Sequence, residues 1–294
     1  MDGGKKILCV GEVLWDALPS GLYLGGAPLN VCYHLSRFDM DALIASRVGD
    51  DRLGNEAVRR IKNLGIPTDL IQIDAEHETG FVKVELSETG DPQYDIVKPA
   101  AWDSIELIPD LEKTAGKAWG MVFGSLAQRN STSRETIQKL WDRSRRLIFD
   151  MNLREPFVDR DRIHESLQVA DIVKMNEEEL NRLTAWYSLR DSPRDAVGQL
   201  ADRFGCSHIC VTRGAEGSML YYNGEWITHG GYPVVAKDVV GAGDAFLAAL
   251  LHGIIKEKEG RELLETANAT GSLVARKDGA TPDYAPEDVW KEMS

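Results

Sequence analysis

The chain is poor in cysteine, basic residues and long apolar runs, and each shortage excludes a class of protein. Four cysteines in 294 residues are too few for a disulfide framework. The 34 lysines and arginines are outnumbered by 47 aspartates and glutamates, so the basic surface that binds nucleic acid is not expected. Aromatic residues make up 7% of the chain and form no evident platform for base stacking. We therefore expect no nucleic-acid partner.

Membrane and targeting signals are also scarce. The apolar run 245–251 falls far below the roughly 20 residues that a membrane span needs, and residues 1–6 are too short and polar to begin a signal peptide. Apolar residues at 43% and charged residues at 28% are typical of a folded soluble chain. These features predict a cytoplasmic protein with no membrane partner.

Several common catalytic motifs do not occur in the chain. There is no G-x-x-x-x-G-K-[ST], no G-x-G-x-x-G after a predicted strand, no H-E-x-x-H and no G-x-S-x-G. The Walker-type and dinucleotide folds, the zinc proteases and the α/β-hydrolases therefore lose their main sequence support.

What the chain does have is an alternation of short apolar runs, turn residues and helical patterns. This order is typical of an α/β fold with a parallel sheet flanked by helices. The predicted strands are 7–10, 43–48, 120–123, 147–149, 172–174 and 209–212. The predicted helices include 30–38, 54–64, 134–144, 177–186 and 196–204. No repeat or linker interrupts the pattern, so we expect a single domain over residues 1–294.

A second, smaller sheet is predicted beside the first. Residues 81–86 alternate in polarity, residues 88–91 have turn chemistry, and residues 94–97 resume an extended pattern. Residues 13–17 and 22–24 are the other candidate strands. The apolar face of a lone hairpin needs cover from a ligand, the core or a second subunit. Cover by a second subunit suggests a homodimer in which the small sheets of the two subunits, their lids, pack against each other.

The segment Asp238-Val-Val-Gly-Ala-Gly-Asp244 lies directly before the apolar helical run 245–255. Gly241 and Gly243 permit a tight turn in which backbone N–H groups converge with the first free amides of the helix. Such a turn favours an anion such as phosphate. A carboxylate at this place, Asp244, is costly unless it has a task such as accepting a proton from an attacking hydroxyl. The alternative is a plain helix cap.

A second polar cluster follows the first predicted strand. Asp16 lies just beyond that strand, and Gly25, Gly26 and Asn30 lie where the chain enters a helix. Ligands of open α/β sheets bind at the carboxyl ends of the strands. We therefore expect Asp16 and Asn30 to hold a polyol while the glycines allow the backbone to approach it. The alternatives are a turn carboxylate for Asp16 and a helix cap for Asn30.

Three motifs in register resemble the ribokinase-like carbohydrate kinases, also called the PfkB family. They are residues 25–30, the turn Gly49-Asp50-Asp51-x-x-Gly54, and residues 241–244 before an apolar helix. The match spans nearly the whole chain. It implies a three-layer α/β/α domain with a mostly parallel sheet, a small β-sheet lid from residues 13–25 and 79–101, and transfer of phosphate from ATP to a sugar with Mg²⁺.

The resemblance also implies roles for particular residues. Asp244 is the base that deprotonates the sugar hydroxyl, and the amides of Gly241, Ala242 and Gly243 hold the phosphoryl group. Asp16, Gly26 and Asn30 contact the sugar, and Asp238 lies near the phosphates and a cation.

Asn176 and Glu179 resemble the family's N-x-x-E element, which organises Mg²⁺ through water, although the same pair is also a capping box. Lys174 reaches a phosphate unless it is a solvated lysine at a strand end. The nucleotide-site candidates that the resemblance adds are Thr212, Arg213, Gly214, Gly217, Asn268 and Ser272.

Residues 25–35, 101–103 and 150–154 look most like fructokinase members of the family. They favour fructose as the acceptor, attacked through its 6-hydroxyl. Arg154 is a candidate contact to substrate or phosphate, with a surface ion pair as the alternative. The other hypotheses are a kinase of 2-keto-3-deoxygluconate, ribose or a nucleoside, and a non-catalytic sensor of sugar or nucleotide.

One position departs from the family pattern. Val239 stands where many members have Thr after the first aspartate of the anion-binding motif, so a hydroxyl is lost. Backbone groups still form the turn, and we expect activity. Whether K⁺ binds near residues 275–281 is left open.

Overall fold

The computed structural model describes residues 5–18, 21–86, 92–190, 192–222, 224–258 and 260–293. Within them the main sheet has nine strands in the order β13-β12-β11-β10-β9-β8-β1-β4-β5. Every neighbouring pair in this order between β11 and β5 is parallel. β12 pairs antiparallel with β11, and β13 pairs antiparallel with β12. The mostly parallel sheet predicted from the sequence is confirmed. Its strands are β1 Ile7–Val10, β4 Ala42–Gly49, β5 Ile71–Asp74, β8 Gly120–Gly124, β9 Leu147–Asp150, β10 Ile172–Asn176, β11 His208–Thr212, β12 Ser218–Tyr222 and β13 Glu225–His229.

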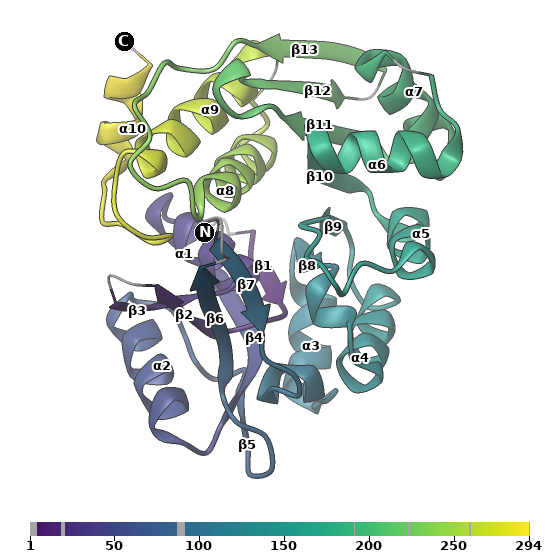
Figure 1. Cartoon of the computed structure of the whole chain (residues 1–294). Coiled ribbons are helices and arrows are strands. Elements are labelled where there is room, and N and C mark those ends of the chain that lie inside the picture. The colour runs from purple at the N-terminus through teal and green to yellow at the C-terminus, as the bar shows by residue number, and fades with distance from the viewer. Residues whose placement is uncertain are drawn as a thin grey trace.

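Helices cover both faces of this sheet, giving three layers (Figure 1). Alternate strand residues face opposite cores: in β8, Val122 packs with α1, α8 and α9, whereas Met121 and Phe123 pack with α3 to α7. The helices are α1 Ala27–Arg37, α2 Arg52–Asn63, α3 Pro109–Lys117, α4 Ser131–Trp141, α5 Arg160–Val169, α6 Glu177–Tyr187, α7 Pro193–Phe204, α8 Ala242–Ile255, α9 Arg261–Ala275 and α10 Pro286–Glu292. The 3₁₀ turns are η1 Ala101–Ser104, η2 Leu126–Gln128 and η3 Gly214–Glu216. In the described part of the chain, no helix has both the length and the apolar character that crossing a membrane requires.

A separate small sheet, called the lid below after the predicted role, has the strand order β3-β2-β6-β7. Its strands are β2 Leu14–Leu18, β3 Gly21–Gly25, β6 Gly80–Leu86 and β7 Pro92–Ile96. β2 and β6 are parallel, and the outer pairs are antiparallel. The predicted small sheet is confirmed, while its predicted turn at residues 88–91 falls outside the described residues.

The Gly49-to-Gly54 turn fixes the start of lid strand β6. Asp51 caps α2 by accepting a hydrogen bond from the amide of Gly54 at 2.7 Å. The same carboxylate accepts the amide and the hydroxyl of Thr79, each at 2.8 Å, and Thr79 Oγ1 accepts the amide of Gly49 at 3.0 Å. This motif therefore attaches the lid to the end of β4.

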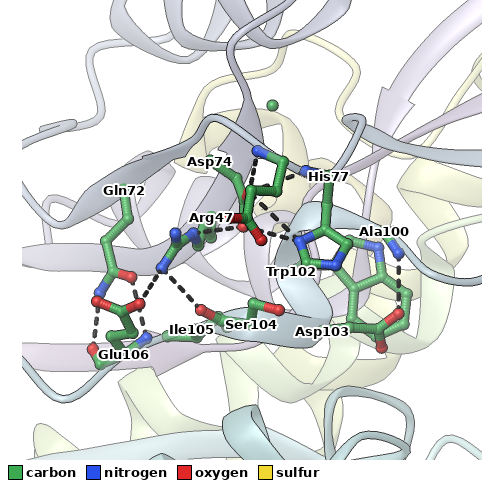
Figure 2. Close-up of polar contacts among 12 residues, drawn as sticks. Arg47, Gln72, Asp74, His77, Ala100, Trp102, Asp103, Ser104, Ile105 and Glu106 are labelled. Carbon is green, nitrogen blue, oxygen red and sulfur yellow. Dashed lines mark hydrogen bonds and ion pairs between the residues drawn. The ribbon is translucent and has the colours of Figure 1, made fainter.

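A network of charged and amide side chains joins β4 and β5 to the segment after the lid. Figure 2 shows Arg47 between Asp74 and Glu106, with Nε 2.7 Å from Asp74 and Nη1 2.9 Å from Glu106. Arg47 also donates to the carbonyl of Ser104 at 3.0 Å. Gln72 accepts the amide of Glu106 and donates to its carbonyl. The turn η1 is thus fastened to the edge of the main sheet.

A buried ion pair holds the other end of the lid. The guanidinium of Arg129 bonds both carboxylate oxygens of Asp103, at 2.7 and 2.9 Å. It also donates to the carbonyls of Ile96 and Val97, where β7 ends, and lies 3.9 Å from the centre of the Trp102 ring. Each side chain of the pair is 1% exposed. Arg129 therefore ties lid and domain together in a site without water screening.

Candidate active site

The turn before α8 has the shape of an anion site. Its N-cap, Gly241, has φ 80°, in the left-handed region that disfavours side chains. A Cβ at Gly241 would also lie 2.6 Å from the carbonyl oxygen of Ala280. Among the described residues no side chain caps this helix. The amide of Ala242 donates to the carbonyl of Val239 at 3.3 Å, so the amides next in the first turn, beginning with Gly243, are the ones open to an anion.

Asp244 projects from the first turn of α8 and is partly buried there. Its Oδ2 accepts a hydrogen bond from Asn30 Nδ2 at 2.8 Å, and Asn30 belongs to α1. The two helix-cap alternatives are wrong, because Gly241 and Gly26 are the N-caps of these helices. Burial raises the pKa of Asp244 to about 6, the charge of Asp150 acts in the same direction, and Lys174 opposes it. The carboxyl is poised to take up a proton near neutral pH.

Lys174 brings a positive charge to the same place. It lies inside β10, not after it, and is 7% exposed, so the solvated strand-end alternative is wrong. Its Nζ donates to Asp150 Oδ1 at 3.0 Å and lies 3.1 Å from where a Cβ at Gly243 would be. Although burial opposes the charge, Asp150 and Asp244 raise the pKa of Lys174. The ammonium therefore faces the anion site in its charged form.

The candidate sugar contacts lie between the lid and α8. Asp16 is in lid strand β2, opposite Tyr23 of β3, and a Cβ at Gly25 would approach Asp16 Oδ2 to 2.7 Å. A side chain at Gly25 would therefore displace this carboxylate. Gly26 follows at the start of α1 with φ 115°. Burial raises the pKa of Asp16 to about 6, and the positive charge of Arg154 opposes the shift.

Glu12 is a buried carboxyl of this site that sequence reasoning missed. It is 2% exposed, and its Oε2 has no hydrogen-bond partner among the described residues. Burial raises the pKa of Glu12 to about 7; Arg154 lowers it and Asp244 raises it. The available signal was its place between the first strand and Asp16, since ligands gather at strand ends.

Arg154 follows β9 and is exposed. Its positive charge lowers the pKa of Glu12, Asp16 and Asp244. This reach toward three carboxyls of the site differs from the surface ion pair that the sequence left as the alternative.

A cavity of about 340 Å³ extends from the anion site toward α9. Of the sequence-predicted nucleotide residues, those that line it are Asn176, Thr212, Gly214, Gly217, Asn268 and Ser272. Ala242 and Gly243 form its other end. Arg213 is not among the described residues of the wall, because its Nη2 donates to the carbonyl of Glu216 within the same loop at 3.2 Å. The role of Arg213 as a nucleotide contact stays a prediction.

Asn176 and Glu179 form the capping box that the sequence offered as an alternative. The amide of Glu179 donates to Asn176 Oδ1, and the amide of Asn176 donates to Glu179 Oε2, both at 2.8 Å. The second carboxylate oxygen of Glu179 accepts the amide of Leu153 at 2.7 Å. Throughout the described ranges no group of three metal-ligating side chains comes together. The role of this pair toward Mg²⁺ stays a prediction.

The Asp238 carboxylate holds two backbone segments together beside the anion site. Its Oδ1 accepts the amide of Val240 at 3.0 Å, and its Oδ2 accepts the amide of Gly279 at 3.1 Å. Val239 is 69% exposed and lines the cavity. Backbone amides thus make the contacts here, while the side chain of Val239 offers no hydroxyl.

We expect Glu12→Gln to flatten the pH dependence of stability. With a folded pKa of about 7 and an unfolded value of 4.5, Glu12 holds its proton more tightly in the folded state. The contribution of Glu12 to the free energy of unfolding, about 3 kcal/mol, is therefore fully present below pH 4.5 and is lost as the pH rises through 7. Urea unfolding of wild type and Glu12→Gln at pH 4.5 and pH 8 measures this difference. Equal pH dependence in the two proteins would contradict the raised pKa of the buried Glu12 carboxyl.

A helix turn with open amides, beside a partly buried carboxyl and a lysine and facing the small sheet, is an arrangement suited to phosphoryl transfer. Comparison with known proteins agrees. The model of the family described as pfkB family carbohydrate kinase matches residues 19–288. The Escherichia coli fructokinase is 31% identical over 94% of this chain and 94% of its own, and that of Klebsiella pneumoniae is 32% identical over 85% and 84%.

Solved structures share the fold. A fructokinase of Xylella fastidiosa with bound ATP superposes with a TM-score of 0.86 at 23% identity, over 99% of this chain and 98% of that one. A sugar kinase of Pyrococcus horikoshii gives 0.78 at 28% identity, over 98% of both chains. The chain belongs to the PfkB family of carbohydrate kinases.

Proposed function

We propose that this kinase transfers the γ-phosphate of ATP to the 6-hydroxyl of fructose, with Asp244 as the general base. The observation that carries the proposal is the partly buried Asp244 carboxyl at the anion turn, which accepts a hydrogen bond from Asn30 of the helix that starts beside the lid. The two bacterial relatives above that exceed 30% identity are both fructokinases, which supports fructose as the acceptor.

The residues of the site divide the work. Asp16, Asn30 and the backbone at Gly25 and Gly26 hold the sugar. Asp244 accepts the proton of the attacking hydroxyl. The amides of residues 241–243, with Lys174, stabilise the charge on the phosphoryl group in flight. The lid excludes water that would otherwise hydrolyse ATP.

The cavity between the η3 loop and α9 takes ATP, with its phosphates directed at Gly243. The residues present fit a Mg²⁺ ion: Asp150 Oδ2 is a buried carboxylate oxygen without a partner among the described residues, and the oxygens of Glu179 reach a cation through water. Mg²⁺ in such sites keeps several waters and binds few carboxylates. Bound there, it would neutralise charge on the phosphates. We extend the proposal to K⁺ near Asp238, tested by comparing turnover in potassium and choline salts.

An acid sugar such as 2-keto-3-deoxygluconate is the second candidate acceptor. The charge of Arg154, directed at Glu12, Asp16 and Asp244, favours a substrate carboxylate. Three features stay predictions: the single-domain organisation, the lid-to-lid homodimer and the cytoplasmic location. Light scattering of the purified protein measures whether it is a dimer.

ADP release with Mg²⁺ and ATP, measured across fructose, glucose, ribose, 2-keto-3-deoxygluconate and adenosine, tests the proposal. We expect the highest kcat/KM with fructose. Preference for the acid sugar, lost in Arg154→Ala, would replace fructose by the second candidate. Binding of ATP without turnover on any acceptor would point to the sensor.

A further inference from the structure

Three side chains of α1 form hydrogen bonds with the segment 280–284 near the C-terminus. Tyr33 donates its hydroxyl to the carbonyl of Pro282 at 2.8 Å. Arg37 Nε donates to the carbonyl of Tyr284 at 2.7 Å. Between them, the ring of His34 lies 2.9 Å from the Ala280 carbonyl through Nε2 and 2.9 Å from the Tyr284 hydroxyl through Nδ1.

These contacts define the state of His34. A carbonyl only accepts, so Nε2 carries the proton and Nδ1 accepts from the Tyr284 hydroxyl. The ring is fully buried. Burial lowers the pKa of His34 to about 4, and the nearby Arg37 acts in the same direction. His34 is therefore a neutral donor aimed at one backbone carbonyl.

That carbonyl belongs to the residue behind the anion turn. Ala280 packs so closely on Gly241 that a Cβ there would lie 2.6 Å from both its Cα and its carbonyl oxygen. The preceding residue, Gly279, donates its amide to Asp238 at 3.1 Å. A shift of Ala280 would consequently move the turn whose amides form the anion site.

His34 lies one helical turn after Asn30, so the two side chains share a face of α1. Asn30 bonds Asp244, and His34 bonds the carbonyl that supports Gly241. We propose that His34 is a positioning residue that fixes the anion turn relative to the sugar-binding helix. The proposal rests on the phosphoryl-transfer function proposed above.

The test compares His34→Ala, His34→Gln and Tyr33→Phe. Gln restores an N–H toward the Ala280 carbonyl, and Tyr33→Phe removes a neighbouring contact between the same two segments without touching Ala280. We expect His34→Ala to lower kcat between about ten- and a hundredfold with little change in the KM for fructose, His34→Gln to recover most of the loss, and Tyr33→Phe to match wild type. Melting temperatures show how far each variant is destabilised.

Two outcomes would overturn the proposal. The first is a His34→Ala kcat equal to that of Tyr33→Phe. The second is a His34→Ala kcat that recovers to the wild-type value when the assay temperature is lowered below the melting range of the variant. If wild type does not turn over any sugar, the proposed function fails, and the affinity for Mg-ATP decides on His34. Weaker Mg-ATP binding in His34→Ala, restored in His34→Gln, supports the positioning role; equal binding in all variants contradicts it.

Discussion

Asp244→Asn is expected to fold like wild type and to lose between about 10² and 10⁴ in kcat. The amide oxygen of Asn still accepts the hydrogen bond from Asn30, but an amide takes up no proton. Removing a carboxyl whose pKa burial raises to about 6 also removes a desolvation cost, so stability at pH 8 should not fall. ADP release and thermal unfolding measure the two effects.

Asp41→Asn is the matched control. Asp41 is an exposed carboxylate that pairs with Lys6 at 3.2 Å, and its loss should leave kcat near wild type. The wild-type kcat should rise as the pH increases through about 6, where Asp244 loses its proton. An Asp244→Asn variant within tenfold of wild type would assign the base elsewhere, and Glu12 would be the next carboxyl to test.

Arg129→Met is expected to lower the free energy of unfolding by about 3 to 5 kcal/mol. Met fills much of the volume but leaves Asp103 charged, buried and unpaired, and it removes the donor to the carbonyls of Ile96 and Val97. Guanidinium chloride unfolding measures the loss.

Two further variants make that result specific. Arg134→Met breaks the partly exposed pair with Glu165 and should cost less than about 1 kcal/mol. Adding Asp103→Asn to Arg129→Met removes the stranded charge and should restore part of the stability. Should Arg129→Met fail to fold, soluble expression of the double variant still reports the effect. An Arg129→Met cost no larger than that of Arg134→Met would contradict the buried ion pair.

The strands of the main sheet that are continuous apolar runs could be predicted, because burial on both faces leaves no polar positions. β12 and β13 could not, since Tyr221, Tyr222 and Trp226 are only partly buried at the sheet edge. α1 begins at Ala27, three residues before the predicted Asn30, because Pro28 is accepted in a first helical turn.

The site was predictable where it is contiguous in sequence. Residues 25–30 and 241–244 each contain a turn and a helix start, and local chemistry points to both. The pairs Lys174–Asp150 and His34–Ala280 join segments 24 and 246 residues apart. Their contact depends on strand register and helix packing, which no local pattern specifies.

The lid strands all lie before residue 97, whereas the wall of the ATP-sized cavity comes entirely from residue 176 onward. The lid contacts proposed for the acceptor and the cavity proposed for the phosphate donor are thus encoded in separate stretches of the gene, while Arg154 lies between them. We expect a designed chimera that exchanges only the first third of the chain to change the lid contacts to the acceptor and to keep Arg154, Asp244 and the donor cavity. The bonds from Arg129 to the carbonyls of Ile96 and Val97 cross the boundary of such an exchange and must be kept intact.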